Sequence, residues 1–236
     1  MSIKIENIEV FGWRGALRGA RMPFMSHKKA DSYWTYVEDE ETLETAEYEF
    51  FMGENDHGLA MKLSKGGPVH GKFMRMVHVQ MDVTANHVWW AEMDTYKVGT
   101  TRNSQSKMHL IHIKPFEWDD FSHEGCDEVD YAREALAETI ATCERLRLDF
   151  NTTHDKKYWR ALIELLPMGY NLTATIDLTY EVLANIYYWR RGHKMFEWHI
   201  FCDMIESLPY SELITCRVKG LHEEETADNT VNEKAV

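Results

Sequence analysis

The chain has 236 residues, of which 44% are hydrophobic and 12% aromatic, and its formal net charge at pH 7 is −13. This composition argues against a disordered chain and suits one sizeable domain, or a domain with helical additions, with a buried core. The acidic balance disfavours non-specific binding to nucleic acid, which needs a basic surface, although a local cluster of cations could still hold a small phosphate.

The sequence offers no segment for a membrane. No stretch approaches the roughly 20 apolar residues of a membrane span, and no N-terminal apolar run resembles a signal peptide. The four cysteines are far apart and form no CxxC pair, which is typical of reduced thiols in the cytosol. We therefore expect a cytoplasmic protein with no membrane partner.

The first elements are expected before residue 32. Residues 3–12 favour a strand with a polar kink at Glu6-Asn7. Residues 13–22 contain the densest basic patch of the chain, made of Arg14, Arg18 and Arg21. These arginines could meet a phosphate, but a short helix whose arginines pair with surface carboxylates is the favoured interpretation.

Two segments then lead to the best-defined pattern of the sequence. Residues 32–49 are polar and acidic and predict an irregular insertion. Residues 54–65 predict a helix, because the following Gly66-Gly67-Pro68 is a strong stop signal. His70 comes shortly after this stop, where a lone histidine is usually structural.

Residues 77–108 hold a strand, a helix and a polar tract in succession. Alternation of apolar residues over 77–83 predicts a strand, with Val77, Val79, Met81 and Val83 on one face. The aromatic-rich residues 86–93 predict a helix, with Thr84 or Asn86 near its N-cap. The hydroxyl- and amide-rich residues 100–107 read as a loop that could hold a phosphate or a base edge, or as a polar surface loop without a ligand.

The second half is predicted to be mainly helical. Residues 107–116 alternate again and predict a strand, and an acidic connection covers residues 118–127. Apolar residues three and four apart predict a long helix over 130–150, with a turn at 151–155. A second helix is predicted over 157–166, stopped by Pro167.

The end of the chain divides into a buried helix and an acidic tail. Met195, Trp198, Cys202 and Ile205 have the spacing of an apolar stripe, which indicates a core or subunit contact. Residues 221–236 are acidic, contain no aromatic residue and predict a solvated tail. The domain is therefore expected to span residues 1–220.

Common catalytic motifs are missing from the sequence. There is no GxSxG, P-loop or GxGxxG pattern. His109 and His112 are expected on opposite faces of a strand, and His193 and His199 are six apart on a helix, so no metal site is predicted.

The strand, helix and polar tract resemble those of the flavin-dependent thymidylate synthases, the thymidylate-synthase-complementing family. That family carries the signature R-H-R-x-x-S-x-N-x-x-S-x-R-Y after a strand and a helix. Asn103 and Ser106 match this signature, and Thr101 replaces its first serine. The three signature arginines are absent, their places being taken by Tyr96, Val98 and Met108.

A second stretch, residues 165–201, resembles the same family. It contains the family's L-P turn and parts of the two helices that follow it. The matching residues are Leu166, Pro167, Leu183, Asn185, Arg190, Trp198 and Ile200. The two stretches cover roughly half of the chain in the family's order.

The resemblance implies a fold and an assembly. The fold would be α/β (α+β), with a mostly antiparallel sheet flanked by long helices, and the protein would form a homotetramer. Variants with these tracts look like sequences carried by phages and gut bacteria.

The resemblance also implies a reaction. The family methylates deoxyuridine monophosphate (dUMP) with a methylene group from a reduced folate and a hydride from reduced FAD. For this chain the substrate would be dUMP or a related pyrimidine nucleotide. A catalytically inactive, nucleotide-binding protein of phage origin remains the alternative, because the missing arginines count against flavin binding.

Site residues follow from the same alignment. Arg190 aligns with the arginine that contacts the pyrimidine and is the catalytic candidate. Asn185 and His70 align with residues that contact the flavin, and Lys97 could substitute for a missing arginine there. Thr101, Asn103, Ser106 and Lys107 are expected to bind the substrate. Five positions apart on a helix, Asn185 and Arg190 point in different directions, which suits a site between subunits.

Overall fold

The computed structural model of the protein describes residues 3–37 and 47–217. The chain divides into two compact units. Unit 1 contains the residues up to Ile8, Gln80–Asp177 and Met195–Ile200, and unit 2 contains Glu9–Val79, Leu178–Lys194 and the residues from Phe201 onward. The domain limit at residue 220 and the acidic tail lie outside the described residues and stay predictions.

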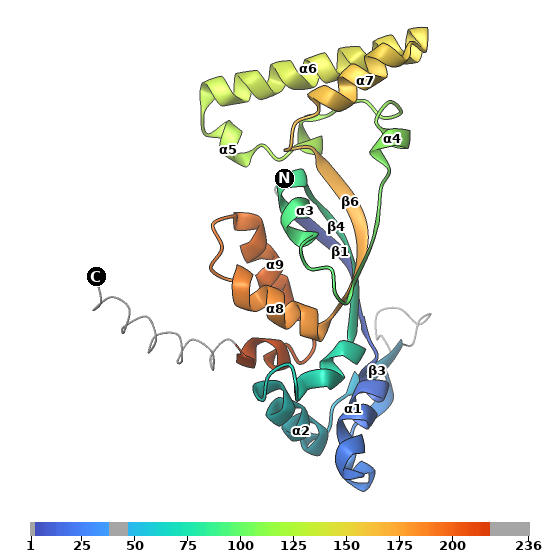
Figure 1. Ribbon diagram of the computed structural model, residues 1–236, viewed down its shortest axis with the longest axis vertical. Helices are drawn as coiled ribbons and strands as arrows, with labels where there is room; N and C mark the ends of the chain where they lie inside the picture. The colour runs from blue at the N-terminus through green and yellow to red at the C-terminus, as the bar shows by residue number, and fades with distance from the viewer. Residues whose placement is uncertain (1–2, 38–46, 218–236) are drawn as a thin grey trace, which may run out of the picture. The chain divides into compact units, whose positions relative to one another are not determined.

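Helices and antiparallel strands combine in this fold, so the predicted α/β (α+β) class is confirmed. Figure 1 labels the main elements. The strands are β1 (Ile3–Phe11), β2 (Tyr33–Val37), β3 (Glu47–Phe51), β4 (His78–Asn86), β5 (Thr100–Ser104) and β6 (Asn171–Thr179). The α-helices are α1 (Trp13–Arg21), α2 (Glu54–Lys65), α3 (His87–Met93), α4 (Lys107–Leu110), α5 (Glu124–Asp127), α6 (Asp130–Thr153), α7 (Lys156–Leu165), α8 (Tyr180–Arg190) and α9 (Phe196–Ser207).

Four strands form one sheet in the order β1-β4-β6-β5, and β2 pairs with β3 in a second sheet. Side-chain pairs show that β4 and β6 run antiparallel: Thr84 lies 2.7 Å from Thr173, and Thr175 donates to Asp82. Asp82 also accepts a hydrogen bond from Asn7 on β1 at 2.7 Å. These polar pairs occupy one face of the sheet.

Apolar residues occupy the opposite face of the sheet. Val79, Met81 and Val83 of β4 are fully buried, as the alternation of the sequence predicts. Leu172, Ala174, Ile176 and Leu178 of β6 are buried in the same way. Period-2 patterning therefore sets which face of β4 and β6 enters the core.

The predicted kink in β1 is also present. Asn7 has a positive φ of 52°, in the left-handed region that asparagine tolerates better than most residues. The strand continues beyond it to Phe11, whose ring stacks on His78.

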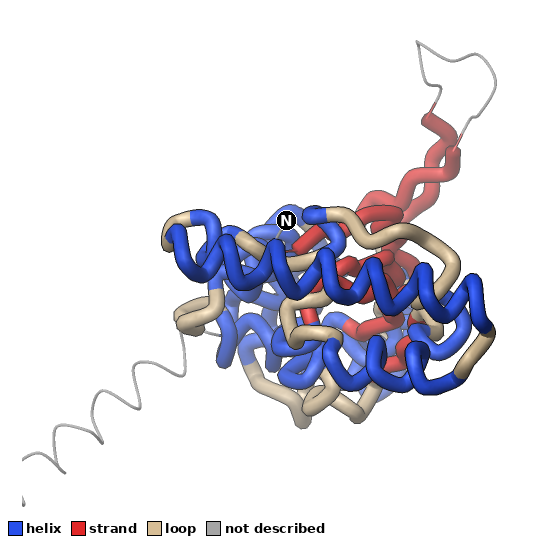
Figure 2. Tube along the Cα trace, turned by 90° about the horizontal axis from the view of Figure 1, so that it is seen from above, coloured by secondary structure: helices blue, strands red, loops and turns tan. Residues whose placement is uncertain are grey.

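The two predicted helices of the middle segment form an antiparallel pair within unit 1, which Figure 2 shows side by side. Buried Cys143 of α6, Leu162 of α7 and Ile111 form their small core, against which Trp159 and Leu166 pack. Helix α6 continues to Thr153, so the turn predicted from residue 151 was wrong at its first three positions. The turn begins at His154, which has a left-handed φ of 55°.

Three other predictions are corrected by the structure. Strands β2 and β3 form an antiparallel hairpin where an irregular insertion was predicted at 32–49. Residues 100–104 are strand β5 rather than a loop. Residues 107–110 are the short helix α4 rather than part of a strand. Met108 and Leu110, which alternate in the sequence, are both exposed, so they do not mark a buried strand face.

Trp13 is the centre of the core in unit 2. Its ring stacks on Phe50 and meets Tyr180 and Tyr210 edge-on. The hydroxyl of Tyr180 donates to the carbonyl of Pro209, and burial raises its pKa above the ordinary value. Helix α1, the β2–β3 hairpin and the chain around residue 210 are thereby held together.

A buried ion pair joins α1 to α2. Arg21 Nε donates to Asp56 Oδ1 at 2.5 Å, and Asp56 is only 1% exposed. Burial alone would raise the pKa of Asp56, but hydrogen bonds from Ser32, Arg21 and two backbone amides lower it below its ordinary value. Arg21 thus pairs with a core carboxylate, whereas surface pairing was predicted.

We expect Asp56→Asn to destabilise the protein by about 3–5 kcal/mol, because the substitution leaves the buried Arg21 charge uncompensated. Urea unfolding measures this loss. As a matched control, Glu164→Gln removes the exposed Arg160–Glu164 pair and should cost less than about 1 kcal/mol. Equal losses for the two variants would contradict the account.

The same pair predicts a pH dependence. Because the folded-state pKa of Asp56 is lowered, its contribution is fully present above the ordinary pKa of 3.8 and is lost as the pH falls through the folded-state value. Below pH 3.8 the parent protein should lose stability more steeply than Asp56→Asn.

Candidate functional site

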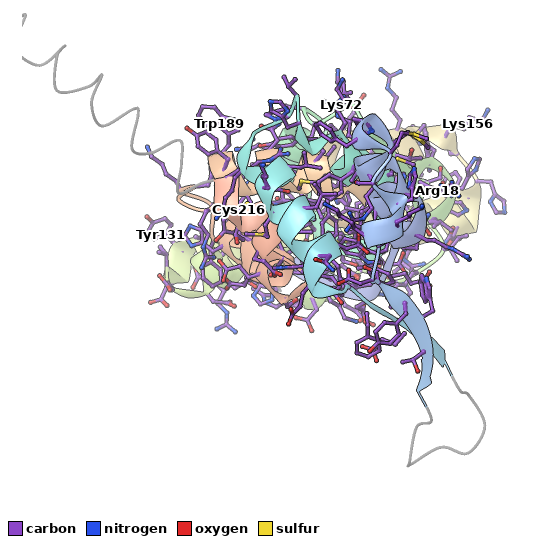
Figure 3. All side chains as sticks on the ribbon, turned by 90° about the horizontal axis from the view of Figure 1, so that it is seen from below. Arg18, Lys72, Tyr131, Lys156, Trp189 and Cys216 are labelled. Atoms are coloured by element: carbon purple, nitrogen blue, oxygen red, sulfur yellow. The ribbon has the colours of Figure 1, made fainter. Side chains whose placement is uncertain are left out.

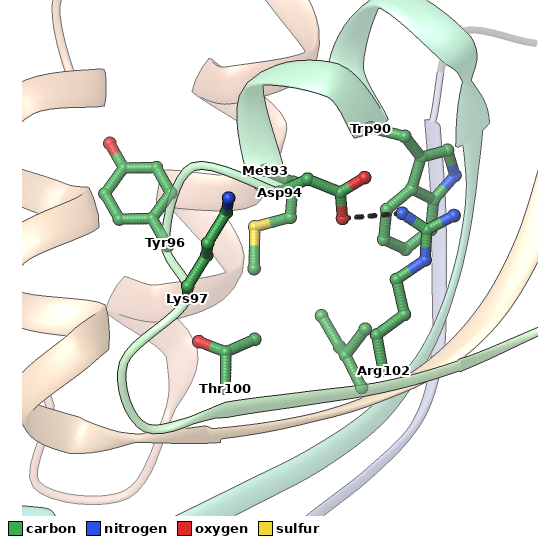
Figure 4. A pocket seen from close by; sticks show the side chains of 8 residues that line it. Trp90, Met93, Asp94, Tyr96, Lys97, Thr100 and Arg102 are labelled. Carbon is green, nitrogen blue, oxygen red and sulfur yellow. Dashed lines mark hydrogen bonds and ion pairs between the residues drawn. The ribbon is translucent and has the colours of Figure 1, made fainter.

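A cavity of about 180 Å³ lies within unit 1, beside helix α3 and strand β5. Figure 4 shows side chains from α3, from the loop after it and from β5 around this space. The lining residues are Trp90, Met93, Asp94, Tyr96, Lys97, Thr100, Arg102 and Ile176. Two of them are cations and one is an acid, so the wall carries a net positive charge.

Asn86 fixes the start of α3. Its side-chain oxygen accepts a hydrogen bond from the backbone N–H of Trp89 at 2.9 Å, so it is the N-cap that the sequence predicted. Its amide nitrogen donates to Ser122 Oγ at 3.1 Å and to Glu197 Oε1 at 3.0 Å. One side chain therefore connects the end of β4, the start of α3 and the first turn of α9.

Trp90 forms the rigid part of the cavity wall. It is almost completely buried, and its indole N–H donates to the carbonyl of Leu172 on β6 at 2.9 Å. The guanidinium carbon of Arg102 lies 3.9 Å from the centre of the Trp90 ring. This cation–π contact holds Arg102 flat against the tryptophan.

The guanidinium of Arg102 has a hydrogen-bond partner at one nitrogen and none at another. Its Nη1 donates to Asp94 at 2.7 Å, a contact drawn in Figure 4. Its Nε is buried and has no hydrogen-bond partner, and the buried hydroxyl of Thr100 has none either. Buried polar atoms normally have a partner. A ligand oxygen in the cavity would supply one for both side chains.

Lys107 and His87 form a second polar pair in unit 1. Lys107 Nζ donates to His87 Nε2 at 3.0 Å, which requires the imidazole to be neutral at that nitrogen. Burial, then the charges of Lys107 and Arg102, lowers the pKa of His87. Burial and Arg102 likewise lower the pKa of Lys107. Positive charge is thus concentrated here, and a bound anion would be stabilised.

Strand geometry separates the predicted substrate residues from the cavity wall. Side chains alternate along β5, so Thr100 and Arg102 face the cavity while Thr101 and Asn103 are exposed. Ser106 is half-buried and precedes α4. Of the site residues predicted from the sequence, Lys97 alone lines this cavity.

The remaining candidates belong to unit 2. His70 is exposed, and its ring lies against Gly66, where an added Cβ would approach the ring to 3.0 Å. Asn185 is exposed on α8, and Arg190 is half-buried at the end of that helix. The site between subunits that Asn185 and Arg190 suggested stays a prediction.

Trp90, Asp94, Thr100 and Arg102 line the cavity but were not predicted from the sequence as site residues. The signal that could have found them is the alternation of Thr100 and Arg102, which becomes visible once residues 100–104 are treated as a strand. Trp90 and Asp94 are four apart on α3, as expected for residues on one helix face.

Metal and disulfide chemistry find no support within residues 3–37 and 47–217. No group of three or more His, Cys, Asp or Glu side chains there could hold a metal ion. All four cysteines are free, and Cys143 and Cys202 are buried. Among the described helices, none has the length and apolar character needed to cross a membrane.

Comparison with known proteins bears on the fold. No family model matches the sequence, and no curated protein matches it. A crystal structure of thymidylate synthase X from Helicobacter pylori, with FAD and dUMP, is similar with a TM-score of 0.62 and 14% sequence identity. The match covers 93% of this chain and 99% of that one.

The chain has a thymidylate synthase X-like fold. A second structure of the Helicobacter pylori flavin-dependent thymidylate synthase with FAD and dUMP agrees, with a TM-score of 0.60 at 14% identity, over 90% of this chain and 96% of that one. The fold implied by the sequence resemblance is therefore confirmed. The phage or gut-bacterial origin stays a prediction.

We expect Lys107→Met to raise the pKa of His87, because the substitution removes a neighbouring positive charge. NMR titration of the imidazole signals measures the change. Lys114→Met is the matched control, since Lys114 pairs with Asp120 instead and should leave the His87 titration unchanged. A His87 pKa that stays constant or falls in Lys107→Met would contradict the assignment.

Proposed function

We propose that the protein is a flavin-dependent thymidylate synthase-like enzyme that methylates dUMP or a related pyrimidine nucleotide. The observation that carries this proposal is the fold, which is shared over almost the whole chain with proteins crystallised with FAD and dUMP. Reduced folate would be the methylene donor, and FAD, when bound, would supply the hydride.

The α3–β5 cavity supports the proposal chemically. Both FAD and dUMP carry phosphate, and the cavity wall has an excess of positive charge from Lys97 and Arg102. The unpartnered Nε of Arg102 and hydroxyl of Thr100 match the acceptor oxygens of a phosphate or a pyrimidine. The residues present therefore fit an anionic nucleotide group.

Cations next to the lost signature positions support the same conclusion. Tyr96, Val98 and Met108 stand where the resembling family has arginine, and Val98 is 90% exposed. Lys97 and Lys107 are each one residue away from such a position, and Arg102 lies between them. We infer that these three side chains take over the phosphate contacts of the missing arginines.

The proposed role of each of these cations follows from the contacts of its side chain. Arg102, held on Trp90, would bind and orient the anion, and Lys97 would add a mobile charge. Lys107 would hold its charge close to β5 through His87. Arg190, Asn185 and His70 remain the proposed catalytic and flavin-contacting residues, in an enzyme proposed to act as a homotetramer.

We expect the protein to bind FAD with flavin absorption bands that remain after desalting, and dUMP to raise its melting temperature. A ligand at 100 times its Kd stabilises the folded state by about 2.7 kcal/mol. Arg102→Gln should weaken binding of at least one of the two ligands about tenfold or more, because it removes a charge-assisted contact. Titration calorimetry measures both affinities.

Arg160→Gln is the matched control, because this exposed arginine on α7 pairs with Glu164 and should leave both affinities unchanged. Growth rescue of a thymidine-requiring host tests the reaction itself. Failure to bind FAD and dUMP, together with failure of rescue, would sink the proposal. Nucleotide binding without flavin or rescue would point to the inactive binding protein instead.

A further inference from the structure

Basic residues of this acidic chain are concentrated in two segments of unit 2. Residues 12–30 and 61–76 together contain nine of the 26 lysines and arginines and no aspartate or glutamate. Neither the cavity nor the resemblance accounts for this segregation. Only one of the nine, Arg21, is neutralised by a buried partner, Asp56.

Glycines bring the two segments together. Helix α1 packs on the 3-10 helix η3 (Gly71–Met76). Gly12 has a positive φ of 99°, and a Cβ there would lie 2.1 Å from the carbonyl oxygen of Met76. Added Cβ atoms at Gly15 and Gly19 would lie 3.6 and 3.5 Å from the Met76 side chain. The close contact therefore needs a glycine at position 12, whereas positions 15 and 19 would have room for a Cβ atom.

The remaining eight cations form what we call the basic surface. They are all exposed, and none makes an ion pair with another described residue. Figure 3 labels Arg18 of α1 and Lys72 of η3 on this side of unit 2. The eight residues are Arg14, Arg18, Lys28, Lys29, Lys62, Lys65, Lys72 and Arg75.

An exposed aromatic ring accompanies these charges. Phe24 is 79% exposed and Met25 is 74% exposed, in the short turn that follows α1. Lys28 and Lys29 come directly after this turn. Cations beside an exposed ring are the combination that single-stranded nucleic acids use, with phosphates on the cations and bases stacked on the ring.

We propose that the basic surface binds single-stranded nucleic acid. Eight unpaired cations outnumber the five large exposed apolar side chains of the same segments, Met22, Phe24, Met25, Val69 and Met76, whereas a membrane-surface site needs a broad apolar face. An acidic peptide would use the charges but not the ring of Phe24. The proposal does not depend on the nucleotide chemistry of unit 1.

The overall charge of −13 does not oppose this proposal. Electrostatic attraction to a nucleic acid is set by the cations that contact phosphates and is screened beyond about 8–10 Å at physiological salt. The expectation of no nucleic-acid partner came from an average over the whole chain. Segregated charge makes the local surface positive.

The test is fluorescence anisotropy of a labelled 20-nucleotide oligo(dT) with the full chain at 50 and 200 mM salt. Four phosphate contacts should make binding about 50-fold tighter at the lower salt, from a slope of about −0.7 per contact. The variant Arg14→Gln, Arg18→Gln, Lys72→Gln, Arg75→Gln should lose this factor and at least tenfold in affinity at 50 mM.

A matched control removes four exposed cations elsewhere: Arg145→Gln, Lys156→Gln, Lys157→Gln, Arg160→Gln. It makes the same change in net charge and should bind within twofold of the parent. Melting temperatures verify that both variants fold. Excess dUMP and FAD should not compete with oligo(dT), which separates this surface from the cavity.

Phe24→Leu distinguishes stacking from apolar insertion, because leucine keeps apolar area but loses the ring. It should weaken oligo(dT) binding about tenfold. The proposal is overturned if oligo(dT) does not bind, or if the basic-surface variant and its control bind equally. It is also overturned if vesicles with 20% anionic lipid bind while oligo(dT) does not.

Discussion

The hydrogen bonds of Asn86 are the constraint on which the candidate site depends. This side chain ends β4, caps α3 and connects to Ser122 and Glu197. Losing it would leave the N–H of Trp89 without its acceptor and would remove one hydrogen bond each from Ser122 and Glu197, which is costly in a partly buried place. Trp90 follows one turn later, so the cap also determines where the cavity wall stands.

Trp90 in turn positions the charged side chains of the candidate site. The ring is anchored by its N–H on β6 and carries the guanidinium of Arg102 on its face. Burial lowers the pKa of both Lys107 and His87; the charge of Arg102 lowers both further, and that of Lys107 also lowers the pKa of His87. A nucleotide phosphate would relieve this concentration of positive charge, which is why a rigid wall with cations beside it suits an anionic ligand.

The two units of the chain differ in how their charged residues are distributed. Unit 1 has a small cationic cavity with unpartnered donors, whereas unit 2 has an open surface of unpaired cations. Acidic residues elsewhere make the total strongly negative, which limits indiscriminate association with polyanions. For binding an anion, the local grouping of cations therefore matters more than the net charge of the whole chain.

The sequence predicted the elements whose apolar residues keep a clear period. Strand β4, helices α2 and α3 and the α6–α7 pair were found because one face of each is buried. Strand β5 was missed since it lies at the edge of the sheet and has polar residues on both faces, so no alternation of hydrophobicity marks it. Because residues 100–104 were predicted to be a loop, the alternation that turns Thr100 and Arg102 toward the cavity was not predicted.

The other features that were not predicted from the sequence are contacts between residues far apart in the chain. Arg21 and Asp56 are 35 positions apart in the sequence, so no local pattern predicts their pairing. The same holds for Arg102 on Trp90, which requires β5 to return beside α3. Residue types alone indicated cations near a polar tract, but their partners depend on the fold.

A crystal structure of the protein with FAD and dUMP tests the central claim most directly. The account predicts a phosphate or pyrimidine oxygen within hydrogen-bond distance of Arg102 Nε and the Thr100 hydroxyl, in the cavity beside α3 and β5. Ligands bound elsewhere, with both atoms still unpartnered, would contradict it.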